Sequence, residues 1–480
     1  MASLPGMRRS RAAVGERYSG LSPVTPWIVV ALALVIIRPQ EYVPLLFGLP
    51  ILNSALVLAT VAWAVAPGKR FDSRQLLVVG LLSAVIVISS LINSGVAGVD
   101  HVVKTYIPGA WLLLLIVTSA RSSADLRLYW EAIALFGVFI VLHTIHIYHH
   151  GIGWTGIEVL VEHGVKRGIY VGIFRDPNDL GMFLVSLAPV YIMWLRRSQG
   201  ALELVVHALL LLLLAYAIYL TNSRGALIGL GVIALLVLYK RYGTWVAVSG
   251  GMMLPILIAV VSVRVTQDFG SDASAVGRLD SWYAGVHMFF ANPIFGVGYD
   301  RFVEFNWLTA HNSFILILAE AGILGYILWT ALLLLNAVGL ARVFRITGTD
   351  AAPLSVVKSQ KYGVSRVGKP TVQAGSAREG TETQTTSVGV ERERVLELGE
   401  ISFLALVGLM ICAFFLSQSY SIYLFVLHAL AAVSLRLAIE NTPPGWLGNC
   451  ELSIGHAVVY SMISVVGLVS LVWVLIRVFN

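Results

Sequence analysis

The chain has 480 residues, of which 58% are apolar and only 12% are charged. Soluble domains carry about 25% charged residues, so this chain has too few to cover a water-facing surface, which excludes an ordinary soluble protein and favours the bilayer as its solvent. The net charge of +7 does not indicate a nucleic-acid partner, because the basic residues lie in short loops between apolar runs, where they determine membrane topology.

Apolar runs long enough to cross a membrane recur along the chain. They lie near residues 22–37, 43–65, 75–92, 102–119, 129–147, 179–195, 202–220, 225–239, 244–262, 313–336, 399–417, 420–437 and 457–476. The first run follows four arginines, Arg8, Arg9, Arg11 and Arg17, without a small-residue cleavage site, which predicts an uncleaved first helix. We therefore expect an all-α polytopic membrane protein with 12 or 13 transmembrane helices.

The distribution of Lys and Arg predicts the orientation of the chain. If the N-terminus lies in the cytoplasm, nearly every short inside loop holds at least a basic pair. Two long loops, near 148–178 and 263–311, then lie outside, and their Trp, Tyr, Phe and Pro residues favour an ordered periplasmic structure. Residues 341–397 lie inside and are rich in Ser, Thr, Gly and charge, so we expect a disordered cytoplasmic loop. It separates a membrane part at 1–340 from C-terminal membrane helices at 398–480.

The cysteine and aspartate patterns do not indicate a metal or redox site. Cys412 lies in an apolar run and Cys450 in a polar loop, without the spacing of metal ligands or of a redox pair. The outer carboxylates Asp268, Asp272 and Asp280 are irregularly spaced. We therefore expect no disulfide, no metal site and no cofactor.

Among the few basic residues of the predicted outer side, Arg224 is the most informative. It follows Ser223 at the start of an apolar run, where an arginine costs roughly 2.5–3.5 kcal/mol at the bilayer centre and less at its edge. A helix start offers unpaired N–H groups and a positive dipole end, and the guanidinium adds a planar fork that fits phosphate oxygens. These properties predict an anion site at the membrane surface. An arginine that only reaches up to lipid headgroups fits the motif equally well.

His311 and Asn312 lie where the second outer loop enters the next apolar run. An imidazole at this place, with an ordinary pKa of about 6.5, can take a proton from a hydroxyl group or donate a hydrogen bond to a phosphate. Asn312 is suited to cap the helix, and Gly322 and Gly325 would let another helix approach. A capping or interface histidine is the commoner explanation of such a residue, and it stays open as the alternative.

Arg278 lies in the second outer loop, just before an expected amphipathic helix at 279–291 that ends at Pro293. The apolar face of this helix would carry Trp282, Val286, Phe289 and Phe290. Such a helix also suits a purely structural lid over the membrane.

Arg175 lies in the first outer loop, before a Pro-Asn turn and a membrane helix. It is suited to serve the same anion as Arg224. The alternative, which the sequence favours, is a salt bridge to Asp176 or Asp179.

The order of these motifs resembles a known family. A Ser-Arg-Gly sequence before one helix, a large outer loop with Asn-Pro-x-x-Gly-Val-Gly, and His-Asn-x9-Gly-x-x-Gly at the next helix are similar to the O-antigen ligase and polymerase superfamily, which includes bacterial protein O-oligosaccharyltransferases. The resemblance covers about residues 165–340. The insert at 341–397 departs from the family's compact 12-helix pattern, as would a thirteenth helix, which leaves the C-terminus outside.

This resemblance implies a fold of the glycosyltransferase-C type in the bacterial inner membrane, with the active site on the periplasmic side. It also implies an undecaprenyl-pyrophosphate-linked glycan as donor, a lipid A-core or another glycan as acceptor, and a metal-independent reaction. His311 then matches the catalytic histidine, and Arg224 matches the arginine that engages the pyrophosphate. The remaining residues expected to bind substrate are Arg175, Ser223, Arg278 and Asn312.

Several functions share these features. A ligase, a polymerase and a protein oligosaccharyltransferase use the same donor, and the intact His-Asn motif favours the ligase. A transporter of lipid-linked sugars would need charged residues within its spans, for which Glu320 is the main candidate. A membrane protease has little support, because the sequence contains neither Gly-x-Ser-x-Gly nor His-Glu-x-x-His.

Overall fold

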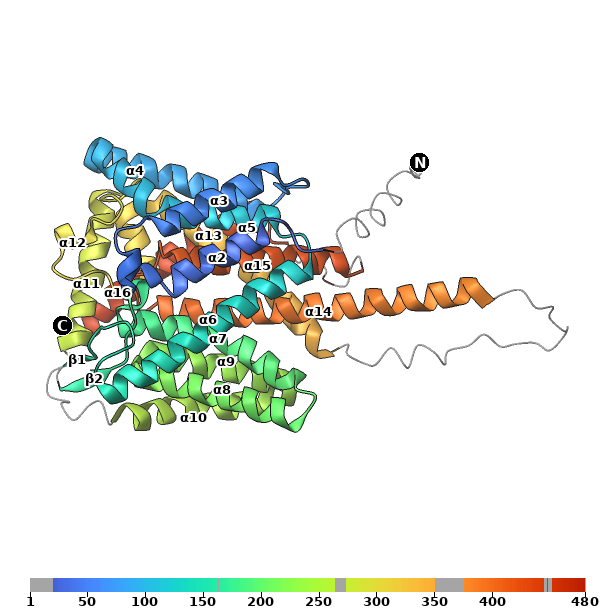
Figure 1. The fold of residues 1–480 in the computed structure, drawn as a ribbon. Coiled ribbons are helices and arrows are strands. Elements are labelled where there is room, and N and C mark those ends of the chain that lie inside the picture. The colour runs from blue at the N-terminus through green and yellow to red at the C-terminus, as the bar shows by residue number, and fades with distance from the viewer. Residues whose placement is uncertain are drawn as a thin grey trace.

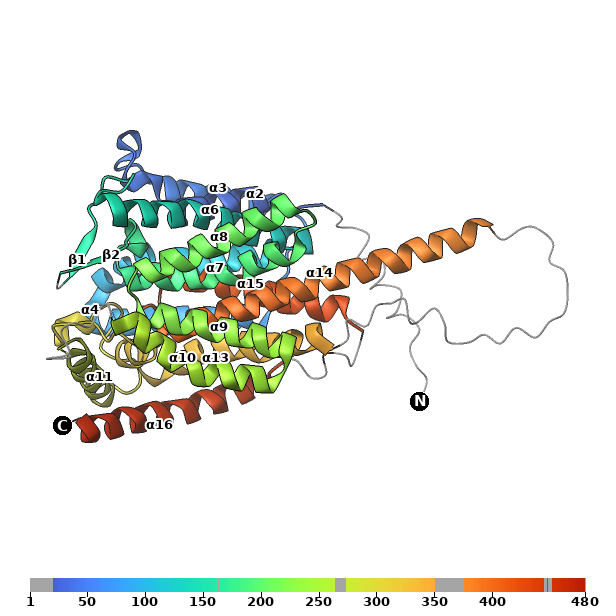
Figure 2. The same ribbon diagram turned by 90° about the horizontal axis from the view of Figure 1, so that it is seen from below.

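The structure is a computed structural model that describes residues 20–162, 164–263, 273–349, 375–443, 447 and 451–479. Nearly all of the described elements are helices, and the long ones run roughly side by side in one bundle (Figures 1 and 2). The described strands, β1 (Leu160–Glu162) and β2 (Val165–Arg167), form a short antiparallel hairpin at one end of this bundle.

Every apolar run expected from the sequence contains a helix. The first half of the bundle consists of α2 (Thr25–Ile36), α3 (Ile51–Val65), α4 (Arg74–Thr105), α5 (Ile107–Ser119), α6 (Ser123–His150), α7 (Pro177–Arg197), α8 (Ala201–Leu220) and α9 (Arg224–Tyr242). The second half consists of α10 (Thr244–Val263), α11 (Ala273–Ala291), α12 (Phe302–Phe305), α13 (Ser313–Thr349), α14 (Gly375–Ala413), α15 (Ile422–Asn441) and α16 (Ile454–Phe479). Short 3-10 helices lie in the loops: η1 (Pro39–Glu41), η2 (Pro44–Leu46) and η3 (Gly172–Phe174).

The lengths of these helices confirm the fold class. Nine helices of the described chain are long and apolar enough to cross a membrane, namely α4, α6, α7, α8, α9, α13, α14, α15 and α16. The helices α3 and α5 are apolar but have only 15 and 13 residues, whereas about 20 span a bilayer. The protein is therefore an all-α multi-pass membrane protein, and the expected 12 or 13 crossings stay a prediction.

Helix α15 lies at the centre of the bundle. Of its most apolar stretch 83% of the residues are buried, against 17% for α8 and 22% for α16. It packs against α5, α13 and α14, whereas α16 lies along one edge (Figure 2). The outer helices expose large apolar side chains such as Val466 and Trp473. An apolar surface of this kind suits contact with lipid. The helical backbone can also face lipid, because a helix satisfies its own backbone hydrogen bonds.

One end of the bundle gathers basic residues that the sequence places in the cytoplasm. The carboxylate of Glu400 in α14 is buried and pairs with Arg196 of α7 at 2.9 Å and with Lys240 of α9. Arg70 pairs with Glu440 at the end of α15. The ends of helices far apart in the sequence thus meet through ion pairs, as a chain that crosses the membrane back and forth requires.

Residues 341–397, expected as a disordered cytoplasmic loop, are helical where the structure describes them. Helix α13 continues to Thr349, and α14 begins at Gly375 (Figure 1). The high charge content suggested disorder, but Glu397 of α14 pairs with Arg197 of α7, so part of this charge is used between helices. The residues between α13 and α14 lie outside the described part of the chain.

At the opposite end, residues 273–312 cover the bundle, and we call this segment the lid. Its helix α11 contains the expected helix at 279–291, and α12 follows it (Figure 1). Trp282 and Val286 are buried as expected, but Phe290 is 63% exposed, so the buried face of the helix is narrower than expected. The preceding residues, including Arg264, Asp268 and Asp272, lie outside the described chain.

The lid docks where α13 is broken at Gly322. This glycine has φ +64°, and the N–H of Ile323 donates to the carbonyl of Pro293 in the lid at 2.8 Å. A Cβ atom at Gly322 would lie 2.4 Å from the carbonyl oxygen of Ile294, so only glycine fits. The sequence predicted that Gly322 admits another helix, but its neighbour is the irregular lid backbone. Gly325, by contrast, faces α4 as expected.

Candidate functional site

Arg224 is the first residue of α9, at the end of the bundle that the lid covers. The turn before it is tight, since Asn222 has φ +51° and the Ser223 hydroxyl caps the helix by accepting the N–H of Ala226 at 3.3 Å. Ser223 is buried, so its hydroxyl serves the cap. The Arg224 guanidinium is exposed and makes no hydrogen bond or ion pair within the described chain, which leaves it available to an external anion.

The connection between α14 and α15, residues 414–421, joins the turn of Arg224 to His311. Phe415 lies 3.3 Å from the Cβ position of Gly225, directly after Arg224. Two residues further on, the Ser417 Oγ accepts the backbone N–H of His311 at 2.8 Å. The two residues predicted to be catalytic therefore flank the same short connection.

His311 has a left-handed backbone conformation with φ +45°, which is uncommon for a residue other than glycine. The next residue, Asn312, caps α13, because its Oδ1 accepts the N–H groups of Phe314 and Ile315 at 2.9 and 3.1 Å. Asn312 is fully buried in this role. The cap is thus Asn312, as expected, and His311 stands just outside the helix with a half-buried side chain.

Charges from two other elements act on His311. Burial lowers the pKa of His311 below its usual 6.5, the positive charge of Arg278 lowers this pKa further, and the negative charge of Asp176 raises it. The lid and the segment before α7 therefore meet at this imidazole. With a lowered pKa the imidazole is neutral near pH 7, which is the form that can accept a proton.

Arg175 lies directly before Asp176, at the start of α7. The salt bridge expected between Arg175 and Asp176 or Asp179 does not form in the described structure. Asp176 instead caps α7 by accepting the N–H of Asn178 at 2.7 Å. The Arg175 guanidinium is exposed and, like that of Arg224, has no hydrogen bond or ion pair with another described residue. Within the described chain, two cations at the histidine's end of the bundle thus have no partner.

Arg167, at the end of β2, ties the start of α7 to the turn of Arg224. Its Nε donates to the carbonyl of Thr221 at 3.1 Å, and its Nη2 donates to Asn178 Oδ1 at 3.0 Å. A further guanidinium nitrogen pairs with Glu162 at 2.6 Å. Arg167 is therefore bonded within the protein, and it connects the segment that carries Arg175 to the turn that carries Arg224.

Arg301 is another outer arginine with a structural role. Its guanidinium pairs with Glu304 at 2.6 Å and donates to the carbonyl of Asn93 in α4 at 2.8 Å. The bond to Asn93 fastens the lid to α4.

Comparison with known proteins relates part of this chain to a described family. Residues 209–330 match the family model described as O-antigen ligase. The resemblance to the O-antigen ligase and polymerase superfamily is thereby confirmed. The matched stretch contains Arg224, Arg278 and His311, whereas Arg175 precedes it.

The chain is also similar to the exopolysaccharide production protein ExoQ of Rhizobium meliloti (strain 1021). The two are 26% identical over 219 residues, which cover 39% of this chain and 50% of the relative. The match thus spans about half the length of that curated protein. Together the two comparisons support an enzyme of the O-antigen ligase and polymerase type.

Sequence patterns did not point to the α14–α15 connection. Ser417, which holds His311, belongs to the run Ser-Gln-Ser-Tyr-Ser between two apolar helices. That polar run at the predicted outer side is the signal by which it could have been found. Asp176 was considered only as a partner of Arg175, although its charge acts on His311.

The described residues contain no group of three His, Cys, Asp or Glu side chains that could hold a metal ion. The expected metal independence is nevertheless a prediction. Asp268, Asp272 and Cys450 lie outside the residues that the structure describes.

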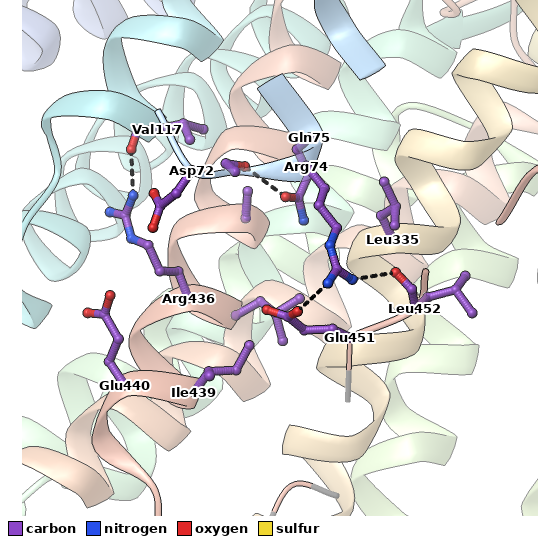
Figure 3. A pocket seen from close by; sticks show the side chains of 13 residues that line it. Asp72, Arg74, Gln75, Val117, Leu335, Arg436, Ile439, Glu440, Glu451 and Leu452 are labelled. Carbon is purple, nitrogen blue, oxygen red and sulfur yellow. Dashed lines mark hydrogen bonds and ion pairs between the residues drawn. The ribbon is translucent and has the colours of Figure 1, made fainter. Parts of the chain in front are cut away.

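A pocket at the other end of the bundle is rich in charge, but its cations are already paired (Figure 3). Arg74 pairs with Glu451 at 2.7 Å and donates to the carbonyl of Leu452 at 2.9 Å. Arg436 donates to the carbonyl of Val117 at 2.8 Å. These bonds join α4 to the segment before α16 and α15 to α5, so the pocket acts as a polar clasp between helices.

Proposed function

We propose that this protein transfers a glycan from an undecaprenyl-pyrophosphate carrier to an acceptor hydroxyl at the periplasmic face of the bacterial inner membrane. The observation that carries this proposal is the surroundings of His311. Its half-buried imidazole is influenced by Arg278 and Asp176, at the end of the bundle where Arg175 and Arg224 have no partner in the described chain. A base beside available guanidiniums suits a reaction whose leaving group is a pyrophosphate.

In the proposed reaction the oxygen of the acceptor hydroxyl attacks the anomeric carbon of the glycan. The bond between that carbon and the pyrophosphate oxygen breaks, and its electron pair leaves with the lipid pyrophosphate. His311 accepts the proton of the hydroxyl group. Arg224, aided by Arg175 and Arg278, stabilises the negative charge on the leaving group by charge-assisted hydrogen bonds. Guanidiniums do this without a metal ion.

The orientation in the membrane follows from the charge distribution. The bundle end opposite the lid carries the ion pairs of Arg70, Arg196 and Lys240. Basic residues favour the cytoplasmic side, so the lid and His311 would face the periplasm. This is the side on which a glycan already carried across the membrane is available.

The acceptor that we favour is lipid A-core, because the matched family is described as O-antigen ligase and the His-Asn motif is intact. The second candidate is another glycan chain, as in the polymerisation of an exopolysaccharide. The similarity to an exopolysaccharide production protein favours this candidate.

Purified full-length protein in lipid nanodiscs, supplied with lipid-linked glycan from the host, would test the reaction. His311→Ala and Arg224→Ala should each abolish transfer, and Arg224→Lys should retain part of it. The matched control is His287→Ala, since His287 is exposed on α11 and its ring contacts that of Tyr283 edge-on. Full activity of His311→Ala would refute the proposed base. Loss of activity in a chelator, restored by magnesium, would refute the metal-free reaction.

The acceptor can be identified from a deletion strain of the host complemented with wild type or His311→Ala. A lipopolysaccharide ladder reduced to bare core would indicate a ligase, and core with one repeat would indicate a polymerase. An unchanged ladder together with lost exopolysaccharide would move the acceptor to the exopolysaccharide.

A further inference from the structure

A second feature of the site is a pocket of about 420 Å³ beneath the lid. Its wall includes Thr309 and Ser417, whose hydroxyl groups are 2.9 Å apart, and Ser417 is the residue that holds the backbone of His311. The volume falls in the range of roughly 300–1,000 Å³ that is common for small-molecule sites. The pocket is therefore large enough for a ligand and adjoins the proposed base.

Two buried polar atoms in this pocket make no hydrogen bond of standard geometry within the described chain. Glu320 is 2% exposed, and its Oε1 accepts the N–H of Phe302 in the lid at 2.9 Å. Its Oε2 and the hydroxyl of Tyr420 are also buried and interact with each other, but neither makes a hydrogen bond of standard geometry with a described residue. Buried polar groups are nearly always well hydrogen-bonded, so two poorly bonded groups from residues that line the same pocket point to a ligand that satisfies them.

The pocket differs from the arginine-rich part of the site, because its described lining contributes no positive charge. Glu320 lines it together with Asp300, which also pairs with His101 at 2.9 Å, and no Lys or Arg is among the described lining residues. Such a lining does not attract a pyrophosphate, whereas carboxyl oxygens accept hydrogen bonds from hydroxyl groups. The rings of Tyr299 and Tyr420, whose centroids are 4.7 Å apart, add apolar surface. Acceptors beside aromatic faces suit an uncharged ring with many hydroxyl groups.

We propose that this pocket is a saccharide subsite that binds a neutral sugar unit of the glycan, with Glu320 Oε2 and the Tyr420 hydroxyl bonded to its hydroxyl groups. The inference rests on the proposed function and divides the site in two. The arginines hold the pyrophosphate, and the pocket holds a sugar beside His311. Either a donor sugar or an acceptor sugar would fit this chemistry, and kinetic measurements distinguish between the two.

Binding can be measured by saturation-transfer NMR on full-length protein in nanodiscs, with the free repeat-unit oligosaccharide and inorganic pyrophosphate as separate probes. Glu320→Gln keeps an oxygen for the N–H of Phe302, and Tyr420→Phe removes only a hydroxyl group. Both should weaken oligosaccharide binding, Glu320→Gln by about ten-fold or more, and leave pyrophosphate binding unchanged. The matched control is Glu304→Gln, which removes an exposed lid carboxylate outside the pocket and should bind both probes normally.

The kinetic constants decide which sugar occupies the pocket. A raised KM for the donor in Glu320→Gln assigns the pocket to the donor glycan, and a raised KM for the acceptor assigns it to the acceptor. Wild-type KM values of Glu320→Gln for both substrates would overturn the inference. It would also be overturned if the wild-type protein did not bind the oligosaccharide, or if Glu320→Gln and Tyr420→Phe bound it normally. None of these results would contradict the transferase. Oligosaccharide binding that depends on Glu320 in a protein without transfer activity would support the pocket and overturn only the transferase.

Discussion

The Oγ of Ser417 accepts hydrogen bonds from the backbone N–H of His311 at 2.8 Å and from the hydroxyl of Thr309 at 2.9 Å. Ser417 thereby fixes a histidine whose φ of +45° carries strain of about 1–3 kcal/mol. Because the connection that contains Ser417 also packs on the turn of Arg224, it sets the relative position of the proposed base and the proposed phosphate ligand.

Replacing Ser417 by alanine should therefore impair turnover without removing a reacting group. The lost hydrogen bond contributes about 1 kcal/mol, so kcat should fall by up to about ten-fold while the KM of the donor changes little. The measurement is the steady-state rate in nanodiscs. The control is Ser419→Ala in the same connection, whose hydroxyl bonds to the carbonyl of Ser313 at 2.7 Å and does not touch His311. Equal rates of the two variants would contradict a positioning role for Ser417.

The pH dependence of transfer should report the charges around His311. If neutral His311 is the base, the rate falls as the pH drops through its pKa. Arg278 lowers this pKa and Asp176 raises it. Arg278→Gln should therefore move the acidic limb of the profile to higher pH, and Asp176→Asn should move it to lower pH. Asparagine can keep the cap of α7, so the second variant should fold.

The readout for these two variants is the midpoint of the acidic limb of kcat/KM, because the absolute rate of Arg278→Gln also reflects phosphate contacts. Midpoints that coincide with wild type in both variants would show that His311 is not the group that titrates.

Gly322→Ala should detach the lid from α13. The residue has φ +64°, and a Cβ atom would lie 2.4 Å from the carbonyl oxygen of Ile294, so strain of about 1–3 kcal/mol adds to a steric clash. Hydrogen exchange should speed up at Ile323, whose N–H bonds to Pro293, and transfer activity should drop. Gly80→Ala in α4 is the control, because its Cβ meets no atom within 4 Å. Unchanged exchange in the lid would contradict the docking role of Gly322.

The sequence predicts features that lie in one continuous stretch of the chain, such as membrane helices. It does not predict features that depend on contacts between residues far apart in the chain. The apolar runs and the motifs of Arg224 and His311 are continuous in the chain, so the runs located the helices and the motifs provided the candidate residues of the site. The break at Gly322 exists because a separate segment, the lid, bonds to the freed backbone. Ser417 has no motif, and its contact with His311 joins residues 106 positions apart. Tertiary contacts of this kind leave little trace in local patterns.

The clasp at the basic end of the bundle should contribute stability without affecting chemistry (Figure 3). Arg436 of α15 donates to the carbonyls of Val117 and Ala120, which are left without helical partners at the end of α5. Arg436→Leu should lower the free energy of unfolding by about 1.5–3 kcal/mol, the usual range for hydrogen bonds from a charged group. The melting temperature in detergent would show this as a clear decrease.

The control for this decrease comes from the same pocket. Arg74 is 42% exposed and its partner Glu451 is 51% exposed, so solvent screens the pair, and Arg74→Gln should cost about 0–1 kcal/mol. Burial, and not charge alone, would then explain the difference between the two arginines. Equal melting temperatures of the two variants would contradict this explanation. Loss of transfer by Arg436→Leu at temperatures where it stays folded would connect the clasp to the distant site.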